Sequence, residues 1–301
     1  MFIRYNFFRR HNENKEIKNY KEFYKHFSNK IEFGGKHSHL DKLINNRFIE
    51  TTGFVITTIL RSQPKTILDL GCGAGLYLPL SGYFSSIRYR GVDYAKKSIL
   101  AAQKTYPNID FFEGDLFNFR APEPADLIIL SSVLILYQKS TDRERILKTV
   151  SSNLSVDGTA LIIVWNHTFV IETCLRVAYF MGRLCGAPRP KDFMGVHFTE
   201  SEMKSELRQN GFDIIDVKHT SSKYGAIECA KYLSLRKFKR DFEKENMLHR
   251  KKMNLNEYQD FCASVGSDSV WVKFIFKISS MFPSFFAMYS VYVIKKNLDN
   301  D

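Results

Sequence analysis

Short apolar runs alternate with longer amphipathic stretches through the middle of this chain. Most runs have the length of a strand, and Asp126–Leu130 is of the continuous apolar type found in buried parallel sheets. The pattern predicts strands over Ile67–Leu70, Tyr89–Tyr94, Ile109–Phe112, Asp126–Leu130, Ala160–Trp165 and Phe212–Val217. It predicts helices over Leu76–Phe84, Ala95–Tyr106, Asp142–Leu154 and Glu200–Asn210. Because strands and helices alternate from residue 66 to 217, we expect right-handed crossovers and a parallel sheet.

The other segments divide the chain into a cap, a sheet domain and two insertions. Residues 1–60 are predicted to form an N-terminal helical cap, whose second helix covers Leu43–Leu60. Residues 61–301 are predicted to form one domain, which closes with a strand over Ala287–Lys295. The predicted insertions into this domain are an apolar lid over 166–199 and a basic helical segment over 218–286.

A glycine-rich turn follows the first predicted strand, within the stretch Thr66–Leu76. Gly71, Gly73 and Gly75 stand at alternating positions, and a strand that ends in Gly-x-Gly-x-Gly before a helix lets its backbone come close to a ligand. Such a turn also serves NAD and FAD, and it occurs as a plain strand-to-helix connection. Asp69, just ahead of the turn, would repel a pyrophosphate but suits a ligand that carries a cationic amino group.

Two further acids follow the next predicted strands at similar intervals. Asp93 comes 24 residues after Asp69, and Asp115 comes 22 residues after Asp93. An acid at the end of the second strand can accept both hydroxyls of a ribose, although the ribose of NAD would be served equally well. Asp93 could instead cap the following helix, and Asp115 could be an ordinary turn residue. Because ligands bind such folds at the strand ends, we expect the glycine turn and the acids to converge there.

The acid, the glycine turn and the two later acids together resemble class I S-adenosylmethionine-dependent methyltransferases, over about residues 60–217 and 287–296. The resemblance implies an α/β fold with a Rossmann-like, seven-stranded, mostly parallel sheet, helices on both faces and an antiparallel last strand. It implies S-adenosyl-L-methionine as the cofactor and methyl transfer as the reaction.

The resemblance also assigns the residues that would contact the cofactor. Asp115 would accept a hydrogen bond from the adenine amino group, while the next backbone N–H meets a ring nitrogen. Two positions depart from the family pattern: Ser155–Thr159 keeps one glycine of a usual Pro-Gly-Gly turn, and Leu136 stands where a histidine is frequent. The second departure suggests an apolar acceptor, or one that needs no base at this position. The assigned cofactor-binding residues are Asp69, Gly71, Cys72, Gly73, Gly75, Asp93, Tyr94, Asp115, Leu116 and Ser131.

The sequence does not single out a catalytic base. An oxygen nucleophile needs its proton removed, and Tyr137, His167 and His197 are the candidates, although a lone histidine is more often a surface or capping residue. A small-molecule or lipid-like acceptor is the first hypothesis, since the lid is apolar. A NAD-dependent oxidoreductase and an inactive nucleotide-binding module are alternatives. Asp69 argues against a NAD-dependent oxidoreductase. The intact series of acids and glycines argues against an inactive module.

The distribution of charge adds RNA as another possible acceptor. The chain of 301 residues has a formal net charge of +12, yet residues 66–166 carry ten basic and ten acidic side chains. The excess lies in two flanking segments, with eight basic and three acidic residues over 1–30 and nine and three over 231–256. Basic flanks attract anionic partners, so they favour either a membrane surface or RNA. The simpler interpretation of the basic residues is that they form helical surfaces exposed to solvent.

Composition places the protein among ordinary globular chains, with 44% hydrophobic and 25% charged residues. The five cysteines include no Cys-x-x-Cys pair, which is typical of reduced thiols in a cytosolic protein, and we expect no metal site. The N-terminus lacks the continuous apolar core of a signal peptide, and no uncharged apolar stretch of about 18 residues is present. We therefore expect a cytoplasmic protein, with peripheral membrane contact as an alternative. The oligomeric state is left open.

Overall fold

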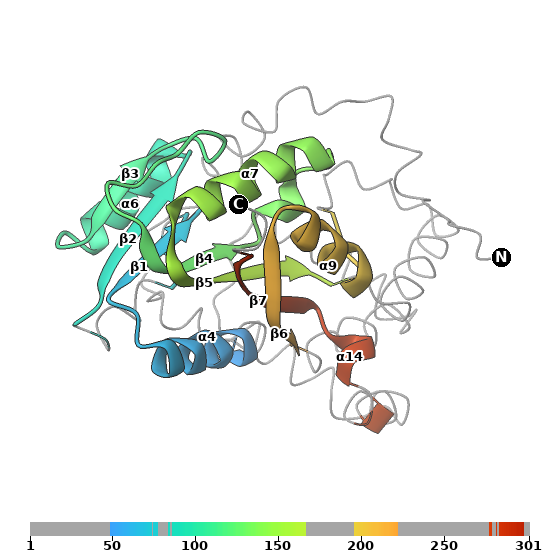
Figure 1. Ribbon diagram of the computed structural model, residues 1–301. Helices are drawn as coiled ribbons and strands as arrows, with labels where there is room; N and C mark the ends of the chain where they lie inside the picture. The colour runs from blue at the N-terminus through green and yellow to red at the C-terminus, as the bar shows by residue number, and fades with distance from the viewer. Residues whose placement is uncertain are drawn as a thin grey trace, which may run out of the picture.

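The computed structural model describes residues 49–73, 75–77, 84, 86–166, 196–221, 277–278, 281 and 283–297. Within them the helices are α4 (Ile49–Ser62), α6 (Lys96–Thr105), η1 (Leu134–Leu136), α7 (Ser140–Asn153), α9 (Glu200–Gln209) and α14 (Pro283–Phe286). The strands are β1 (Thr66–Leu70), β2 (Arg88–Asp93), β3 (Asp110–Glu113), β4 (Ala125–Ser131), β5 (Leu154–Trp165), β6 (Phe212–Thr220) and β7 (Tyr289–Lys296). Figure 1 shows these elements as one sheet flanked by helices.

The seven described strands form one sheet in the order β3-β2-β1-β4-β5-β7-β6. The pairs β1–β2, β1–β4, β2–β3 and β4–β5 are parallel, whereas β7 runs antiparallel to both β5 and β6. This confirms the expected α/β sheet with an antiparallel last strand. The strand order reverses between β1 and β4, and ligands bind open α/β sheets beside such a reversal.

The predicted strands agree with the structure except around the start of β5. We predicted a turn at Ser155–Thr159 and a strand from Ala160, but β5 begins at Leu154, so that boundary is wrong. Leu154 already pairs with Ala125 of β4, and the pairing then slips so that Thr159 lies opposite Leu127. The extra residues of β5 are accommodated within the strand as an irregularity of the kind produced by a β-bulge.

Several sequence predictions lie wholly or mostly outside the described residues. They are the N-terminal part of the cap, most of the predicted helix over residues 76–84, the lid over 166–199 and most of the basic insertion over 218–286. Four of the five cysteines also lie there, and Cys72 is a buried free thiol. No helix among the described residues is both long and apolar enough to cross a membrane.

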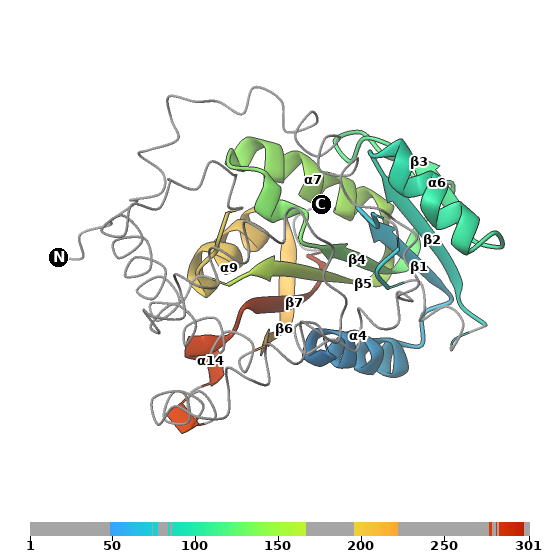
Figure 2. The same cartoon turned by 180° about the vertical axis from the view of Figure 1, so that it is seen from behind.

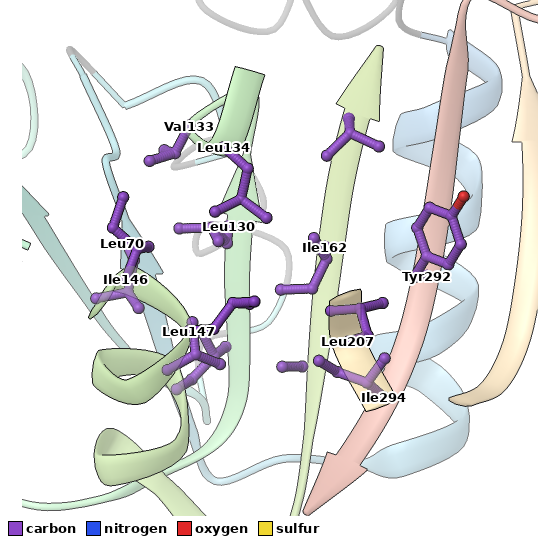
Figure 3. Close-up of a cluster of buried hydrophobic side chains, with 14 of the residues drawn as sticks. Leu70, Leu130, Val133, Leu134, Ile146, Leu147, Ile162, Leu207, Tyr292 and Ile294 are labelled. Atoms are coloured by element: carbon purple, nitrogen blue, oxygen red, sulfur yellow. The ribbon is translucent and has the colours of Figure 1, made fainter. Parts of the chain in front are cut away.

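Helices cover both faces of the sheet, because side chains alternate between the faces along each strand. On one face, α7 and α9 contribute Ile146, Leu147 and Leu207 to a core with strand residues such as Leu130 and Ile162 (Figure 3). On the other face, α4 and α6 pack against a second apolar cluster. Figure 2, seen from behind, shows α4 on the opposite side of the sheet from α7 and α9.

Helix α4 belongs to the packed core although most of it falls in the predicted cap. Val55 and Ile59 are buried in the second apolar cluster. The hydroxyl of Thr51 lies 2.7 Å from that of Thr220 at the end of β6. The Glu50 carboxylate accepts a hydrogen bond of 2.6 Å from the Ser221 backbone. These contacts attach α4 to β6, and the division of the chain at residue 60 stays a prediction.

A buried ion pair joins α7 to α9 on the other face. The Arg143 guanidinium donates two hydrogen bonds to the Glu206 carboxylate, of 2.6 and 2.9 Å. It also donates to the backbone carbonyls of Tyr137 and Gln138 and lies over the Phe198 ring. One side chain therefore connects both helices to the segment after β4 and to the segment before α9.

We expect Glu206→Gln to lower the free energy of unfolding by about 1–2 kcal/mol, because a charge-assisted bidentate pair becomes a neutral contact around a buried guanidinium. Urea unfolding measures this change. Glu144→Gln is the control, since Glu144 pairs with Lys148 on the exposed surface of α7 and should change stability by less than about 0.5 kcal/mol. Equal effects of the two substitutions would contradict the role of Glu206.

Candidate cofactor-binding site

The glycine turn after β1 adopts a conformation that suits glycine at each of its three positions. Gly71, Gly73 and Gly75 have φ angles of +78°, +56° and +92°, in the left-handed region that side chains disfavour. The turn is fixed to β2, because the backbone N–H groups of Gly71 and Cys72 both donate to the Val92 carbonyl, at 2.8 and 3.0 Å. The tight turn that the sequence predicted after this strand therefore has a direct backbone explanation, while the helix predicted to follow it lies mostly outside the described residues.

The loops after β3 and β4 lie against this turn. A Cβ atom placed on Gly71 would come within 2.5 Å of a Val133 methyl group and 3.7 Å of a Leu116 methyl group. The Gly114 backbone N–H donates to the Asp93 carbonyl at 3.0 Å. The carboxyl ends of β1 to β4 therefore meet at one edge of the sheet, as the sequence predicted.

Asp93 links the end of β2 to the glycine turn. One carboxylate oxygen accepts from the Gly73 N–H and the other from the Ala95 N–H, each at 2.8 Å. Burial raises the pKa of Asp93, while these two backbone hydrogen bonds lower it. Asp93 is not the N-cap residue of α6, because that residue is Ala95, two positions later. Asp93 nevertheless accepts a hydrogen bond from the backbone at the start of this helix. The carboxylate thus supports the turn itself, and each oxygen retains a second lone pair for a ligand hydroxyl.

Asp69 is 2% exposed and faces the α4 side of the sheet. Its carboxylate accepts a hydrogen bond of 2.6 Å from the Tyr89 hydroxyl. Burial raises the pKa of Asp69 to about 7, the bond from Tyr89 lowers it, and the nearby Asp93 raises it further. No cation contributes to this balance among the described residues, so a cationic ligand would supply the missing counter-charge.

The remaining predicted cofactor residues lie at the same edge. Asp115 is half-buried, and its carboxylate accepts from the Phe117 backbone at 3.1 Å, so it also shapes its own turn. Leu116 is buried beside Gly71, and Tyr94 is 41% exposed. The Ser131 hydroxyl lies 3.4 Å from that of Tyr77. The structure places these residues together, while their contacts with a cofactor stay predictions.

The catalytic candidates differ in their surroundings. Tyr137 is buried in the core on the α7 face, where its ring packs 5.4 Å from that of Phe117. His197 is half-buried, and its ring lies 5.3 Å from that of Trp165 at the end of β5. His167 lies outside the described residues. Of the two described candidates, His197 is the less buried residue, and a catalytic role for either stays a prediction.

Sequence reasoning missed Tyr77, Tyr89 and Ser132. Both tyrosines are buried around Asp69, and Ser132 has a φ of +58° directly after β4. Tyr89 could have been found, because it lies four residues before Asp93 in one strand and so shares its face. No sequence signal marks Ser132, since a left-handed serine is set by its tertiary surroundings.

These residues fit S-adenosylmethionine on two structural counts. The left-handed glycines keep side chains out of the turn, so the backbone can lie close to a ligand. A buried carboxylate without a cationic partner among the described residues lies beside that turn, and S-adenosylmethionine carries both an ammonium and a sulfonium. A pyrophosphate would instead bring negative charge towards Asp69 and Asp93.

Comparison with known proteins identifies the domain. The family model described as "Methyltransferase domain" matches residues 67–158. The chain is 24% identical over 162 residues to the putative methyltransferase 235L of Invertebrate iridescent virus 6, covering 52% of this chain and 60% of that protein. It is 28% identical over 109 residues to trans-aconitate 2-methyltransferase of Yersinia pestis (strain Pestoides F), covering 36% of this chain and 41% of that protein. The matches thus span between two fifths and three fifths of these relatives.

Among solved structures, magnesium protoporphyrin IX methyltransferase from Synechocystis PCC 6803 with bound S-adenosylhomocysteine superimposes with a TM-score of 0.48 and 19% identity, over 66% of this chain and 88% of that chain. A methyltransferase from Clostridium acetobutylicum ATCC 824 gives a TM-score of 0.46 and 12% identity, over 81% and 89%.

The strand order, the edge at which the loops meet and the family match define the class of the domain over residues 67–158. This part of the chain is a methyltransferase domain of the class I S-adenosylmethionine-dependent type. S-adenosyl-L-methionine is the cofactor of this class of domain, and the sequence predictions of fold and cofactor are confirmed.

Proposed function

We propose that this protein transfers a methyl group from S-adenosylmethionine to a small-molecule or lipid-like acceptor. The observation that carries the proposal is the Asp93 carboxylate, which connects the glycine turn to the start of α6 beside a second buried carboxylate, Asp69. This arrangement favours a ligand that presents hydroxyl groups and positive charge.

Bound at this edge, the cofactor would supply a methyl group on a sulfonium. The acceptor nucleophile would bond to the methyl carbon while the carbon–sulfur bond breaks in line, so that S-adenosylhomocysteine is the leaving group. The contribution of the chain is to hold and orient both partners. Asp93 would accept the ribose hydroxyls, Asp69 would face the cationic end, and the glycine turn would let the backbone approach. His197, whose ring packs against that of Trp165 at the end of β5, is the candidate that we favour for removing a proton from an oxygen nucleophile.

Two observations support a small or lipid-like acceptor. In the 3-10 helix η1 (Leu134–Leu136), directly beyond β4, Leu134 and Ile135 are buried in the core, so the side chain that this helix leaves partly exposed at the edge is the apolar Leu136. One relative is named for trans-aconitate, which is a small molecule. The basic flanks would attract an anionic acceptor or a membrane surface, and we propose a cytoplasmic location. RNA is the alternative that charge favours.

Isothermal titration tests the cofactor, with S-adenosylhomocysteine and NAD as the two ligands. We expect S-adenosylhomocysteine to bind and NAD not to bind; the reverse result would favour the oxidoreductase alternative. Incubating the protein with a cell extract and methyl-labelled cofactor then tests the acceptor. Label in the small-molecule or lipid fraction supports the proposal, whereas label in RNA overturns this choice of acceptor.

A further inference from the structure

Tyr89 occupies a particular position between the two strands that carry the acids. In the parallel pairing of β1 with β2, Asp69 lies opposite Gly91. Tyr89 and Asp93 stand two residues before and after Gly91, and side chains two apart in a strand share a face. Asp69 therefore lies between a hydroxyl donor on one side and a like-charged carboxylate on the other.

Gly91 keeps the space between these residues free of a side chain. A Cβ atom there would lie 2.8 Å from the Cys72 sulfur and 3.0 Å from the Phe111 ring. The Tyr89 ring is itself buried in the α4-side core, together with Phe111 and Ile99. Packing thus fixes the ring, so its hydroxyl is held in place as a hydrogen-bond donor before any ligand arrives.

The hydrogen bond from Tyr89 is the described interaction that favours the charged form of Asp69. The titratable groups around this carboxylate are Cys72 and Tyr77 from the glycine turn and Tyr89 and Asp93 from β2. Burial and Asp93 both raise the pKa of Asp69, whereas the bond from Tyr89 lowers it. At 2.6 Å, this bond has the length of a strong, charge-assisted O–H···O⁻ contact.

We propose that Tyr89 is a positioning residue for cofactor binding: its hydroxyl fixes the orientation of the Asp69 carboxylate and stabilises its ionised form, which receives the cationic end of S-adenosylmethionine. This inference rests on the proposed function. It adds that cofactor affinity rises as Asp69 ionises, and that Tyr89 determines the pH at which this happens.

The experiment measures the dissociation constant of S-adenosylhomocysteine, which keeps the ammonium group, from pH 5.5 to 9 in the wild type and in Tyr89→Phe. Loss of the hydroxyl should move the rise in affinity to higher pH. At pH 6 to 7 the variant should bind roughly tenfold more weakly, the effect of losing one hydrogen bond to a charged group. Near pH 9 the two proteins should converge.

Tyr292→Phe is the matched control. Tyr292 is buried, as Tyr89 is, but it belongs to the core cluster on the other face of the sheet (Figure 3). The Tyr292→Phe substitution should leave the pH dependence of S-adenosylhomocysteine binding unchanged. A second comparison introduces Tyr89→Phe into Asp69→Asn, where no carboxylate remains to ionise. There the tyrosine substitution should produce no pH-dependent loss of affinity.

Distinct outcomes separate this inference from the proposed function. If the wild type and Tyr89→Phe have the same pH profile, or if affinity falls equally at every pH, the positioning role is overturned while the proposed function stands. If the wild type fails to bind S-adenosylhomocysteine at every pH, the proposed function is overturned and this inference with it. A shift confined to proteins that contain both Asp69 and Tyr89→Phe supports the role.

Discussion

Asp69→Asn is expected to raise the free energy of unfolding at pH 8 by up to about 4 kcal/mol relative to the wild type, while it weakens cofactor binding. The pKa of this carboxyl is about 7 in the folded protein against a reference value of 3.8. Between about pH 4 and 7 the folded protein keeps a proton that the unfolded chain has already released. The stability of the wild type therefore falls as the pH rises through this window.

The asparagine variant lacks this ionisation, so its stability should not show that decline. Its amide oxygen can still accept the hydrogen bond from Tyr89, which preserves the packing. Urea unfolding at pH 5, 6.5 and 8 measures the difference. Asp110→Asn is the control, since Asp110 at the start of β3 is largely exposed and should follow the wild-type curve. Parallel curves for wild type and Asp69→Asn would contradict the buried, protonated carboxyl.

The same variant should bind S-adenosylhomocysteine at least about tenfold more weakly at pH 8, where the wild-type carboxylate is ionised, because a charged acceptor becomes a neutral amide. Isothermal titration measures this loss. A protein that gains stability and loses binding through one substitution indicates a residue retained for its ligand. A gain in stability with undiminished binding would place the cationic end of the cofactor elsewhere.

Asp93→Ala is expected to weaken binding of S-adenosylhomocysteine by roughly 1–3 kcal/mol, about 5- to 150-fold in the dissociation constant. The substitution removes the predicted acceptor of the ribose hydroxyls. It also leaves the Gly73 and Ala95 N–H groups without their carboxylate acceptor, so the glycine turn loses its side-chain link to β2 and keeps only the backbone bonds to Val92. Titration calorimetry measures the change.

Two variants separate these contributions. Asp93→Asn keeps one acceptor oxygen and nearly the same shape, so it should lose less affinity than the alanine variant. Asp110→Ala removes a carboxylate from the opposite end of the neighbouring strand β3 and should bind as the wild type does. A dissociation constant unchanged by Asp93→Ala would overturn the ribose assignment, whatever its effect on stability.

The sequence alone was sufficient for the sheet and for its binding edge. Strand length, apolar continuity and alternation with helices are local properties, and they placed six of the seven strands close to their observed bounds. The start of β5 was the exception, because pairing of Leu154 with Ala125 extends the strand through a segment whose composition indicates a turn. Parallel strands bring their carboxyl ends to one edge, so the convergence of Gly71, Asp93 and Asp115 also followed from order along the chain.

The surroundings of each acid were decided by tertiary structure. The sequence shows Asp69 before a glycine turn, but only the pairing of β1 with β2 puts the Tyr89 hydroxyl on its carboxylate. Burial then raises the pKa of Asp69. The Asp93 carboxylate accepts hydrogen bonds from backbone N–H groups of two different loops. Periodicity fixes which face a residue occupies, whereas desolvation and hydrogen bonding depend on neighbours that are distant in sequence. The class of cofactor could therefore be predicted from the sequence. The electrostatics of its site could be determined only from the tertiary structure.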